Sequence, residues 1–130
     1  MAMLNNLFLL VLSLIGFASA KTVWHVKPEP IQLVNENQSI QLNCEFKEVP
    51  ASNASNYYVI WYKDGASSNV LSLNDKLANP NATRYEISGK YNFVIKNATQ
   101  KDSGLYTCQL FQSNELVASV RLTVLGKVFF

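Results

Sequence analysis

The chain has 130 residues, of which 48% are apolar, and its 11 basic and 9 acidic side chains give a formal net charge of +2. This length fits one ordinary globular domain and argues against a multidomain enzyme. The charge is too small for the basic stripe that a phosphate backbone requires, and no run of five or six like charges occurs, so nucleic acid is not expected as a partner.

The first 20 residues form a segment of their own. None of them is charged, and an almost unbroken apolar run from Leu7 to Phe17 is followed by Ala18-Ser19-Ala20. Signal peptidase accepts small side chains like these at the −3 and −1 positions before the cleaved bond. The apolar run is also shorter than the roughly 20 residues that a membrane span needs. We therefore predict a signal peptide over residues 1–20, a secreted or cell-surface product, and no membrane span in this chain.

Short stretches that alternate apolar and polar residues follow. The first places Ile40, Leu42, Cys44 and Phe46 on one side, as in a single half-buried strand. The same period of two recurs at Phe93 and Ile95, at Tyr106, Cys108 and Leu110, and at Ala118, Val120, Leu122 and Val124. Turn signals separate these segments, and none shows a sustained period near 3.6. We predict an all-β domain of roughly seven to nine short strands over residues 21–125, packed as a two-sheet sandwich, with a short tail at 126–130.

The chain holds two cysteines, Cys44 and Cys108, and no third thiol. In an exported protein the default for such a pair is a single internal disulfide. Both cysteines occupy inward positions of their strands, so the bridge is expected to cross the core. Closing the long loop from Cys44 to Cys108 gives roughly 4 kcal/mol of stabilisation in the chain-entropy model.

The two cysteines, a tryptophan between them and a motif that ends at the second cysteine follow one another in a characteristic order. Trp61 follows Cys44, and Asp102-x-Gly104-x-Tyr106-x-Cys108 comes later, preceded by Phe93-x-Ile95-x-x-Ala98. This order closely resembles the immunoglobulin superfamily over essentially the whole chain after residue 20. The resemblance implies an immunoglobulin-like Greek-key sandwich with one inter-sheet disulfide. In it Trp61 packs on the bridge, and Tyr106 forms the tyrosine corner.

The resemblance also carries over to the stretch between Trp61 and Arg84. Arg84 looks like the arginine that forms a salt bridge with Asp102 and closes one end of the sandwich in V-type and intermediate domains. Val70-Leu71-Ser72-Leu73 stands where a C′ strand would lie, with room for a C″ strand after it. The choice between V-type and I-type stays open. The last strand lacks the Phe-Gly-x-Gly bulge of antigen-receptor variable domains, which argues against an antibody or T-cell receptor chain.

Four Asn-x-Ser/Thr sequons begin at Asn37, Asn53, Asn81 and Asn97. All four fall in expected turns or strand ends of an exported domain, so we predict N-linked glycans on them. By the resemblance, none lies on strands C, F or G, and one sheet face is left bare.

Alternation from the inward Trp61 and Cys108 points three sets of side chains outward on that bare face. They are Tyr58, Ile60 and Tyr62 in strand C, Thr107, Gln109 and Phe111 in strand F, and Val117 and Arg121 in strand G. Exposed aromatic clusters commonly mark interaction surfaces. We predict that this C–F–G face binds another extracellular protein or a second copy of the chain, with Arg121 and the polar rim fixing orientation. The competing interpretation is that a C′ strand or the tail at 126–130 covers these rings.

Catalysis is not expected. His25 is the only histidine, and the chain has no Cys-x-x-Cys, His-x-x-x-His or Gly-rich phosphate loop. We predict neither a metal nor another cofactor. The expected role is recognition in adhesion, signalling or defence. The alternative is a soluble decoy or a truncated isoform of a single-pass membrane receptor, because only residues 126–130 follow the last expected strand.

Overall fold

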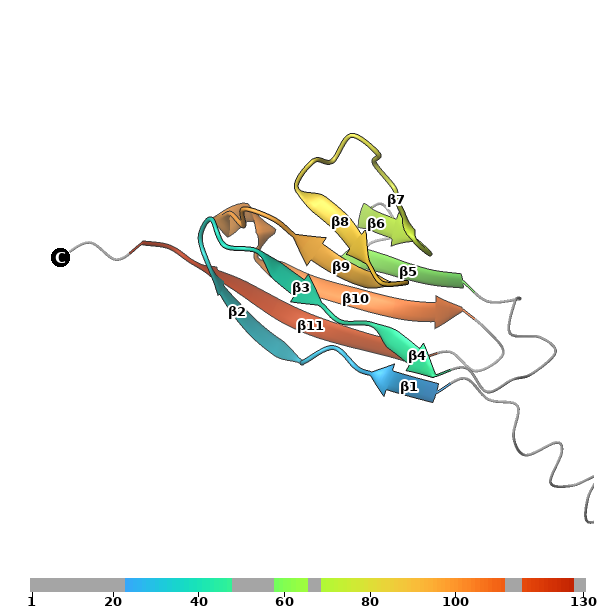
Figure 1. Ribbon diagram of the computed structural model, residues 1–130. Helices are drawn as coiled ribbons and strands as arrows, with labels where there is room; N and C mark the ends of the chain where they lie inside the picture. The colour runs from blue at the N-terminus through green and yellow to red at the C-terminus, as the bar shows by residue number, and fades with distance from the viewer. Residues whose placement is uncertain (1–22, 48–57, 66–68, 112–115, 128–130) are drawn as a thin grey trace, which may run out of the picture.

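The computed structural model describes residues 23–47, 58–65, 69–111 and 116–127. Within these ranges the chain forms eleven strands and one three-residue 3-10 helix (Figure 1). In chain order they are β1 (Val23–Val26), β2 (Ile31–Asn35), β3 (Ile40–Leu42), β4 (Glu45–Lys47), β5 (Tyr58–Lys63), β6 (Val70–Leu73), β7 (Lys76–Leu77), β8 (Tyr85–Ser88), β9 (Asn92–Ile95), η2 (Gln100–Asp102), β10 (Gly104–Phe111) and β11 (Leu116–Leu125).

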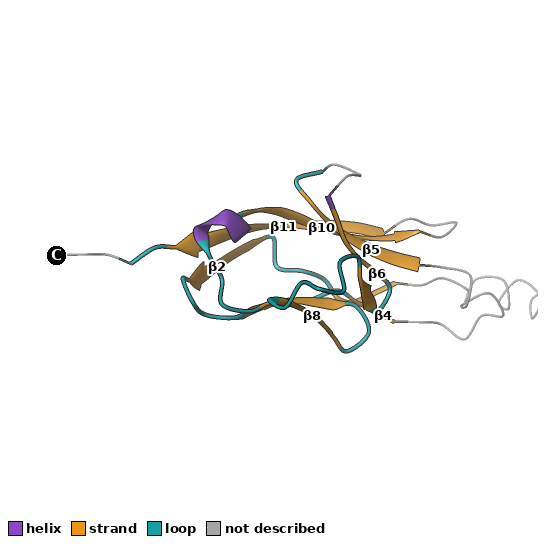
Figure 2. Cartoon of the chain, turned by 90° about the horizontal axis from the view of Figure 1, so that it is seen from above, coloured by secondary structure: helices purple, strands orange, loops and turns teal. Residues whose placement is uncertain are grey.

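The strands form three sheets that make two layers. The larger layer is a six-stranded sheet with the order β2-β11-β10-β5-β6-β7, and the other layer contains the sheets β3-β9-β8 and β1-β4. Viewed along the sheets, β5, β10 and β11 lie on one side and β4 and β8 on the other (Figure 2). Neighbouring strands are antiparallel except β2, which runs parallel to β11. The predicted all-β sandwich is confirmed.

The segment predicted as one strand across residues 40–46 is divided in two. β3 pairs with β9, whereas β4 pairs with β1 in a different sheet. The break occurs at Cys44, whose backbone N–H donates to the side-chain oxygen of Asn92 at 2.7 Å. A side chain thus takes the place of a neighbouring strand. The first strand of the sandwich is also divided, into β1 and β2, because Pro28 and Pro30 between them offer no N–H to a ladder. The described residues therefore hold more strands than the seven to nine predicted.

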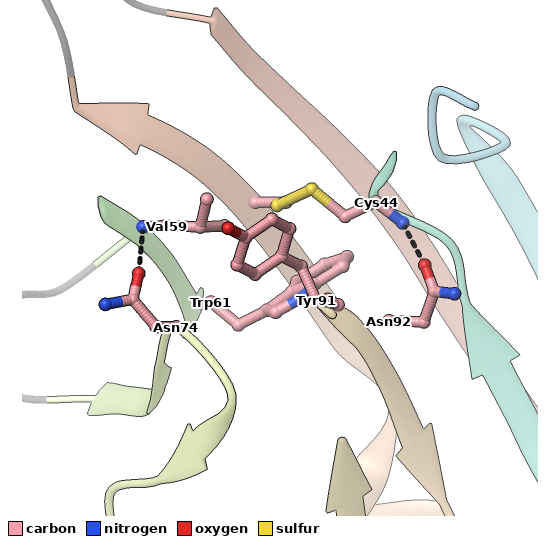
Figure 3. The surroundings of a disulfide bond; sticks show 7 residues. Cys44, Val59, Trp61, Asn74, Tyr91 and Asn92 are labelled. Atoms are coloured by element: carbon pink, nitrogen blue, oxygen red, sulfur yellow. Dashed lines mark hydrogen bonds between the residues drawn. A yellow bond between two sulfur atoms is a disulfide. The ribbon is translucent and has the colours of Figure 1, made fainter. Parts of the chain in front are cut away.

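The core lies between the layers, around the disulfide (Figure 3). The predicted bond between Cys44 and Cys108 is present, with their Cα atoms 6.5 Å apart. Trp61 is fully buried beside it, and its indole N–H donates to the carbonyl oxygen of Tyr91 at 2.6 Å. The indole is therefore held both by packing and by a bond to the opposite layer. The other fully or almost fully buried apolar side chains are Leu42, Val59, Phe93, Ile95, Ala98, Tyr106, Leu110, Val120 and Leu122.

Arg84 and Asp102 form a bidentate ion pair at one end of the sandwich, with N–O distances of 2.7 and 3.1 Å. The Tyr106 hydroxyl donates to the backbone carbonyl of Asp102 at 2.6 Å, so the same turn is tied to β10. Burial raises the pKa of the Asp102 carboxyl, but hydrogen bonds from Arg84 and Thr99 outweigh it, and this pKa lies below its usual value of 3.8. Burial raises the pKa of the Tyr106 phenol, which stays protonated.

Candidate functional site

Strands β5 and β10 bring most of the predicted partner-binding residues together. Their antiparallel register pairs Tyr58 with Phe111 and Ile60 with Gln109, and Tyr62 follows two residues later. Residues directly opposite each other in an antiparallel pair point to the same face. The intervening residues of both strands are buried in the core. The alternation read from the sequence therefore places these five side chains on one outward surface.

Two contacts fix the aromatic side chains within this surface. The rings of Tyr58 and Phe111 are stacked, with centroids 5.2 Å apart and an interplanar angle of 18°. The Tyr62 hydroxyl donates to Oε1 of Gln109 at 3.1 Å. Tyr58 is 47% exposed and the other three are half-buried. The rings are thus ordered against one another while still presenting apolar surface to solvent.

Strand β6 adds two side chains that the sequence analysis did not assign. Leu73 lies opposite Ile60 and Val70 opposite Tyr62, and they are 48% and 37% exposed. They are three residues apart in the sequence and still share a face, because the register shifts by one residue between these pairs at an irregularity of the β-bulge type. A strict period of two cannot place both on one face. The apolar character of this four-residue strand was the signal in the sequence from which its contribution to the face could have been inferred.

We call the seven residues Tyr58, Ile60, Tyr62, Val70, Leu73, Gln109 and Phe111 the outer cluster. A surface hollow of about 270 Å³ lies within it, lined by five of these residues and Gly65. Strand β6 pairs beside β5 in the same sheet, so it widens the apolar surface instead of covering the rings. Strand β6 is anchored there by Asn74, whose side-chain oxygen accepts the backbone N–H of Val59 at 2.9 Å (Figure 3).

Arg121 is not brought to the outer cluster. It lies opposite Leu105 on one side and Ile31 of β2 on the other, far along β10 from Phe111. Between these two ends lies Thr107, which lies opposite Tyr62 and Ser119 on the outward face, as predicted, but is only 4% exposed. Its hydroxyl lies 2.8 Å from that of Ser119, so two short side chains bond to each other between larger neighbours. Arg121 thus shares the outward face but lies apart from the outer cluster, whereas Val117, which is 47% exposed, lies directly opposite Gln109 and borders the cluster.

Three of the four sequon asparagines lie in the described part of the chain. Asn37, Asn81 and Asn97 are exposed, and all are outside the strands of the six-stranded sheet. Asn37 and Asn97 have φ angles of 68° and 50°, the left-handed conformation that asparagine adopts in turns. Asn53 lies outside the described residues, as do the predicted signal peptide and residues 128–130. Glycosylation stays a prediction.

The described residues contain no group of three or more His, Cys, Asp or Glu side chains suited to a metal ion. His25 is exposed on β1. Over the same residues, no helix is long and apolar enough to cross a membrane.

Comparison with known proteins places these features in context. A family model described as immunoglobulin domain matches residues 23–124. The vascular endothelial growth factor receptor kdr-like of Danio rerio is 35% identical over 75 residues, which cover 58% of this chain and 5% of that protein. Junctional adhesion molecule C of Homo sapiens is 30% identical over 118 residues, which cover 88% of this chain and 36% of that protein. The chain therefore spans about a third or less of the length of either relative.

A solved structure agrees in fold. The crystal structure of the RIG-5 IG1 homodimer superposes with a TM-score of 0.67 at 20% identity, covering 84% of this chain and 100% of that chain. At this identity the likeness concerns the fold alone.

Proposed function

Because the chain belongs to the immunoglobulin domain family, we propose that it is an extracellular recognition module that binds another protein through the outer cluster. The observation that carries the proposal is the group of aromatic and aliphatic side chains on β5, β6 and β10, which remain partly exposed although a fully folded core lies beneath them.

The composition of the outer cluster suits a protein interface. Aromatic side chains are enriched at the centres of such interfaces, and a polar residue such as Gln109 supplies a hydrogen-bonding group beside them. The stacking of Tyr58 on Phe111 and the bond from Tyr62 to Gln109 fix these side chains before any partner arrives. Less conformational freedom is then lost on binding, which favours affinity for a given contact area.

The positions of the sequons also support the outer cluster as the binding surface. Asn37, Asn81 and Asn97 lie in turns outside β5, β6 and β10. Glycans at these positions would leave the outer cluster accessible, while covering other parts of the surface. We include N-glycosylation and export through the segment 1–20 in the proposal.

The names of similar proteins agree with recognition as a function. One relative is a junctional adhesion molecule, and one structural neighbour is a homodimer. The partner of this chain is accordingly an extracellular protein, either a different one or a second copy of the chain.

A multivalent binding assay tests the proposal. The chain, produced in a host that forms disulfides and adds glycans, is displayed on beads and tested against itself and a panel of extracellular proteins, because multivalency makes weak contacts measurable. We expect Ile60→Asp combined with Phe111→Asp to weaken binding at least about tenfold, since both charges enter the apolar centre.

The matched control is Val23→Asp combined with Gln41→Asp, which places two carboxylates on exposed positions of the opposite layer. This variant should bind like the unmodified chain. The proposal is wrong if the Ile60→Asp, Phe111→Asp variant retains its thermal unfolding transition and still binds, or if the control loses binding equally.

A further inference from the structure

The two edges of the six-stranded sheet differ in how they are protected. One edge is β7, which has two residues, includes the charged Lys76 and follows directly after Asp75. Very short strands and lysines are devices by which proteins prevent edge strands from pairing with other chains. The other edge is β2, five residues long, with the sequence Ile-Gln-Leu-Val-Asn and no charge or proline.

Among the residues that the structure describes, none pairs with the backbone of β2 on the side away from β11. Arg121 N–H donates to the carbonyl of Pro30, and Glu36 N–H donates to the carbonyl of Leu125. In a parallel ladder these bonds use alternate residues, so the even-numbered residues of β2 bond to β11. The N–H and C=O groups of Ile31 and Leu33 therefore point away from the sheet. Strand β2 lies along the lower margin of the sheet in Figure 1.

The side chains at these two positions are the most exposed of the large apolar residues that the structure describes. Ile31 is 72% exposed and Leu33 is 60% exposed, and both point to the outward face of the sheet. Neither lies in the outer cluster, from which β11 separates them. Unpaired backbone groups and exposed apolar side chains thus coincide on one unprotected strand.

From this coincidence we infer that β2 is a second interaction surface, at which two copies of the chain pair edge to edge. In an antiparallel arrangement about a two-fold axis, Ile31 of each copy lies opposite Leu33 of the other, and Gln32 lies opposite Gln32. Residues 31 and 33 then exchange backbone hydrogen bonds, because these are the residues with free groups. The four exposed apolar side chains meet on one face of the joined sheet.

A second copy is the occupant that the strand itself favours. The free groups of Ile31 and Leu33 repeat at a spacing of two residues, which is self-complementary when the strand is turned by 180°. The uncharged strand brings no like charges into opposition at the axis. The paired strands are short, so the contact is smaller than a standard interface of about 1,600 Å² and the dimer is weak, with a dissociation constant on the order of 0.1 mM.

Sedimentation equilibrium with increasing protein concentration, to about 0.5 mM, tests the pairing. The Ser39→Ala background removes the sequon of Asn37, which lies two residues beyond β2, without altering the asparagine in its positive-φ turn. We expect a reversible dimer that Leu33→Lys weakens at least about tenfold, because a lysine on each strand opposes edge pairing. The matched control is Leu73→Lys, on an exposed leucine of the outer cluster, and it should leave this dimer intact.

A cross-link tests the register. Residues 32 of the two copies face each other as a non-hydrogen-bonded pair, with Cα atoms about 4.5 Å apart, a distance compatible with a disulfide. Gln32→Cys should therefore form a covalent dimer on mild oxidation, and Gln41→Cys, exposed on β3, should not. The inference is wrong if the chain stays monomeric, if Leu73→Lys rather than Leu33→Lys abolishes the dimer, or if both cysteine variants cross-link equally.

Discussion

The inner and outer surfaces of the six-stranded sheet are made by the same strands but differ in how their side chains are held. On the inner surface Trp61 and Tyr106 are fully buried, and each donates a hydrogen bond to a backbone carbonyl. On the outer surface Tyr58 and Phe111 hold each other by stacking and remain partly exposed. Inner side chains are thus held by burial and by hydrogen bonds to the backbone, whereas these outer side chains hold each other and still present surface to solvent.

The largest expected effect comes from removing the bridge of the inner surface. We expect Cys44→Ala combined with Cys108→Ala to lower the free energy of unfolding by about 2–5 kcal/mol, because the unfolded chain is no longer constrained. Chemical denaturation of the variant and of the oxidised chain measures this difference. A loss below about 1 kcal/mol would show that packing around Trp61 holds the two layers without the disulfide.

The next effect contrasts the ion pair at the end of the core with one on the surface. Asp102→Asn leaves Arg84 without its charged partner, and we expect a loss of about 2 kcal/mol. The control is Glu86→Gln, which removes the exposed pair between Glu86 and Lys96, 3.6 Å apart. A surface pair of this kind contributes about 0–1 kcal/mol. Similar losses in the two variants would contradict the comparison.

The same aspartate gives the sign of a pH dependence. The pKa of Asp102 is lowered in the folded chain, so its contribution to stability is complete above the usual value of 3.8 and is lost as the pH falls through the folded pKa. Denaturation curves recorded between neutral pH and about pH 2 should therefore converge for the unmodified chain and Asp102→Asn as acid is added. Curves that stay parallel throughout would exclude this role of the carboxylate.

A smaller effect is expected on the outer surface. Phe111→Ala removes the stacking on Tyr58 and part of a half-buried ring, and we expect a loss of about 1 kcal/mol, well below the roughly 3–5 kcal/mol expected for Trp61→Ala in the core. Thermal unfolding of both variants measures the ratio. Equal destabilisation would mean that the outer cluster is a structural part of the domain.

The smallest effect compares two serine hydroxyls on opposite surfaces. Ser72 of β6 is fully buried on the inner surface, and its hydroxyl has no hydrogen-bond partner among the described residues, whereas the hydroxyl of Ser119 lies 2.8 Å from that of Thr107. We expect Ser72→Ala to raise the free energy of unfolding by about 0.5–1 kcal/mol and Ser119→Ala to lower it by about 0.5 kcal/mol. The same sign for both variants would contradict the assignment of their partners.

Alternation predicted most of the outer cluster because β5 and β10 are regular and their inward residues are marked by Trp61 and Cys108. It failed at β6, where the register shift puts Val70 and Leu73 on the same face despite their spacing of three. At Thr107 alternation gave the direction of the side chain but not its exposure, which also depends on the neighbouring side chains. Position on the outward face is a local property, but accessibility is set by neighbours from other strands.

By itself, the sequence determined the two-sheet sandwich and its bridge, since alternating strands, two inward cysteines and a tryptophan between them leave few other ways to bury the apolar side chains. Tertiary structure alone decided which strands lie at the edges. Two features bring together segments far apart in the sequence. A hydrogen bond from Cys44 to Asn92 divides β3 from β4, and the chain crosses between the layers after β1, so that β1 pairs with β4 and β2 pairs with β11. The exposure of Ile31 and Leu33 follows from that sheet order, because both point to the outward face of a strand that has a described neighbour on one side only.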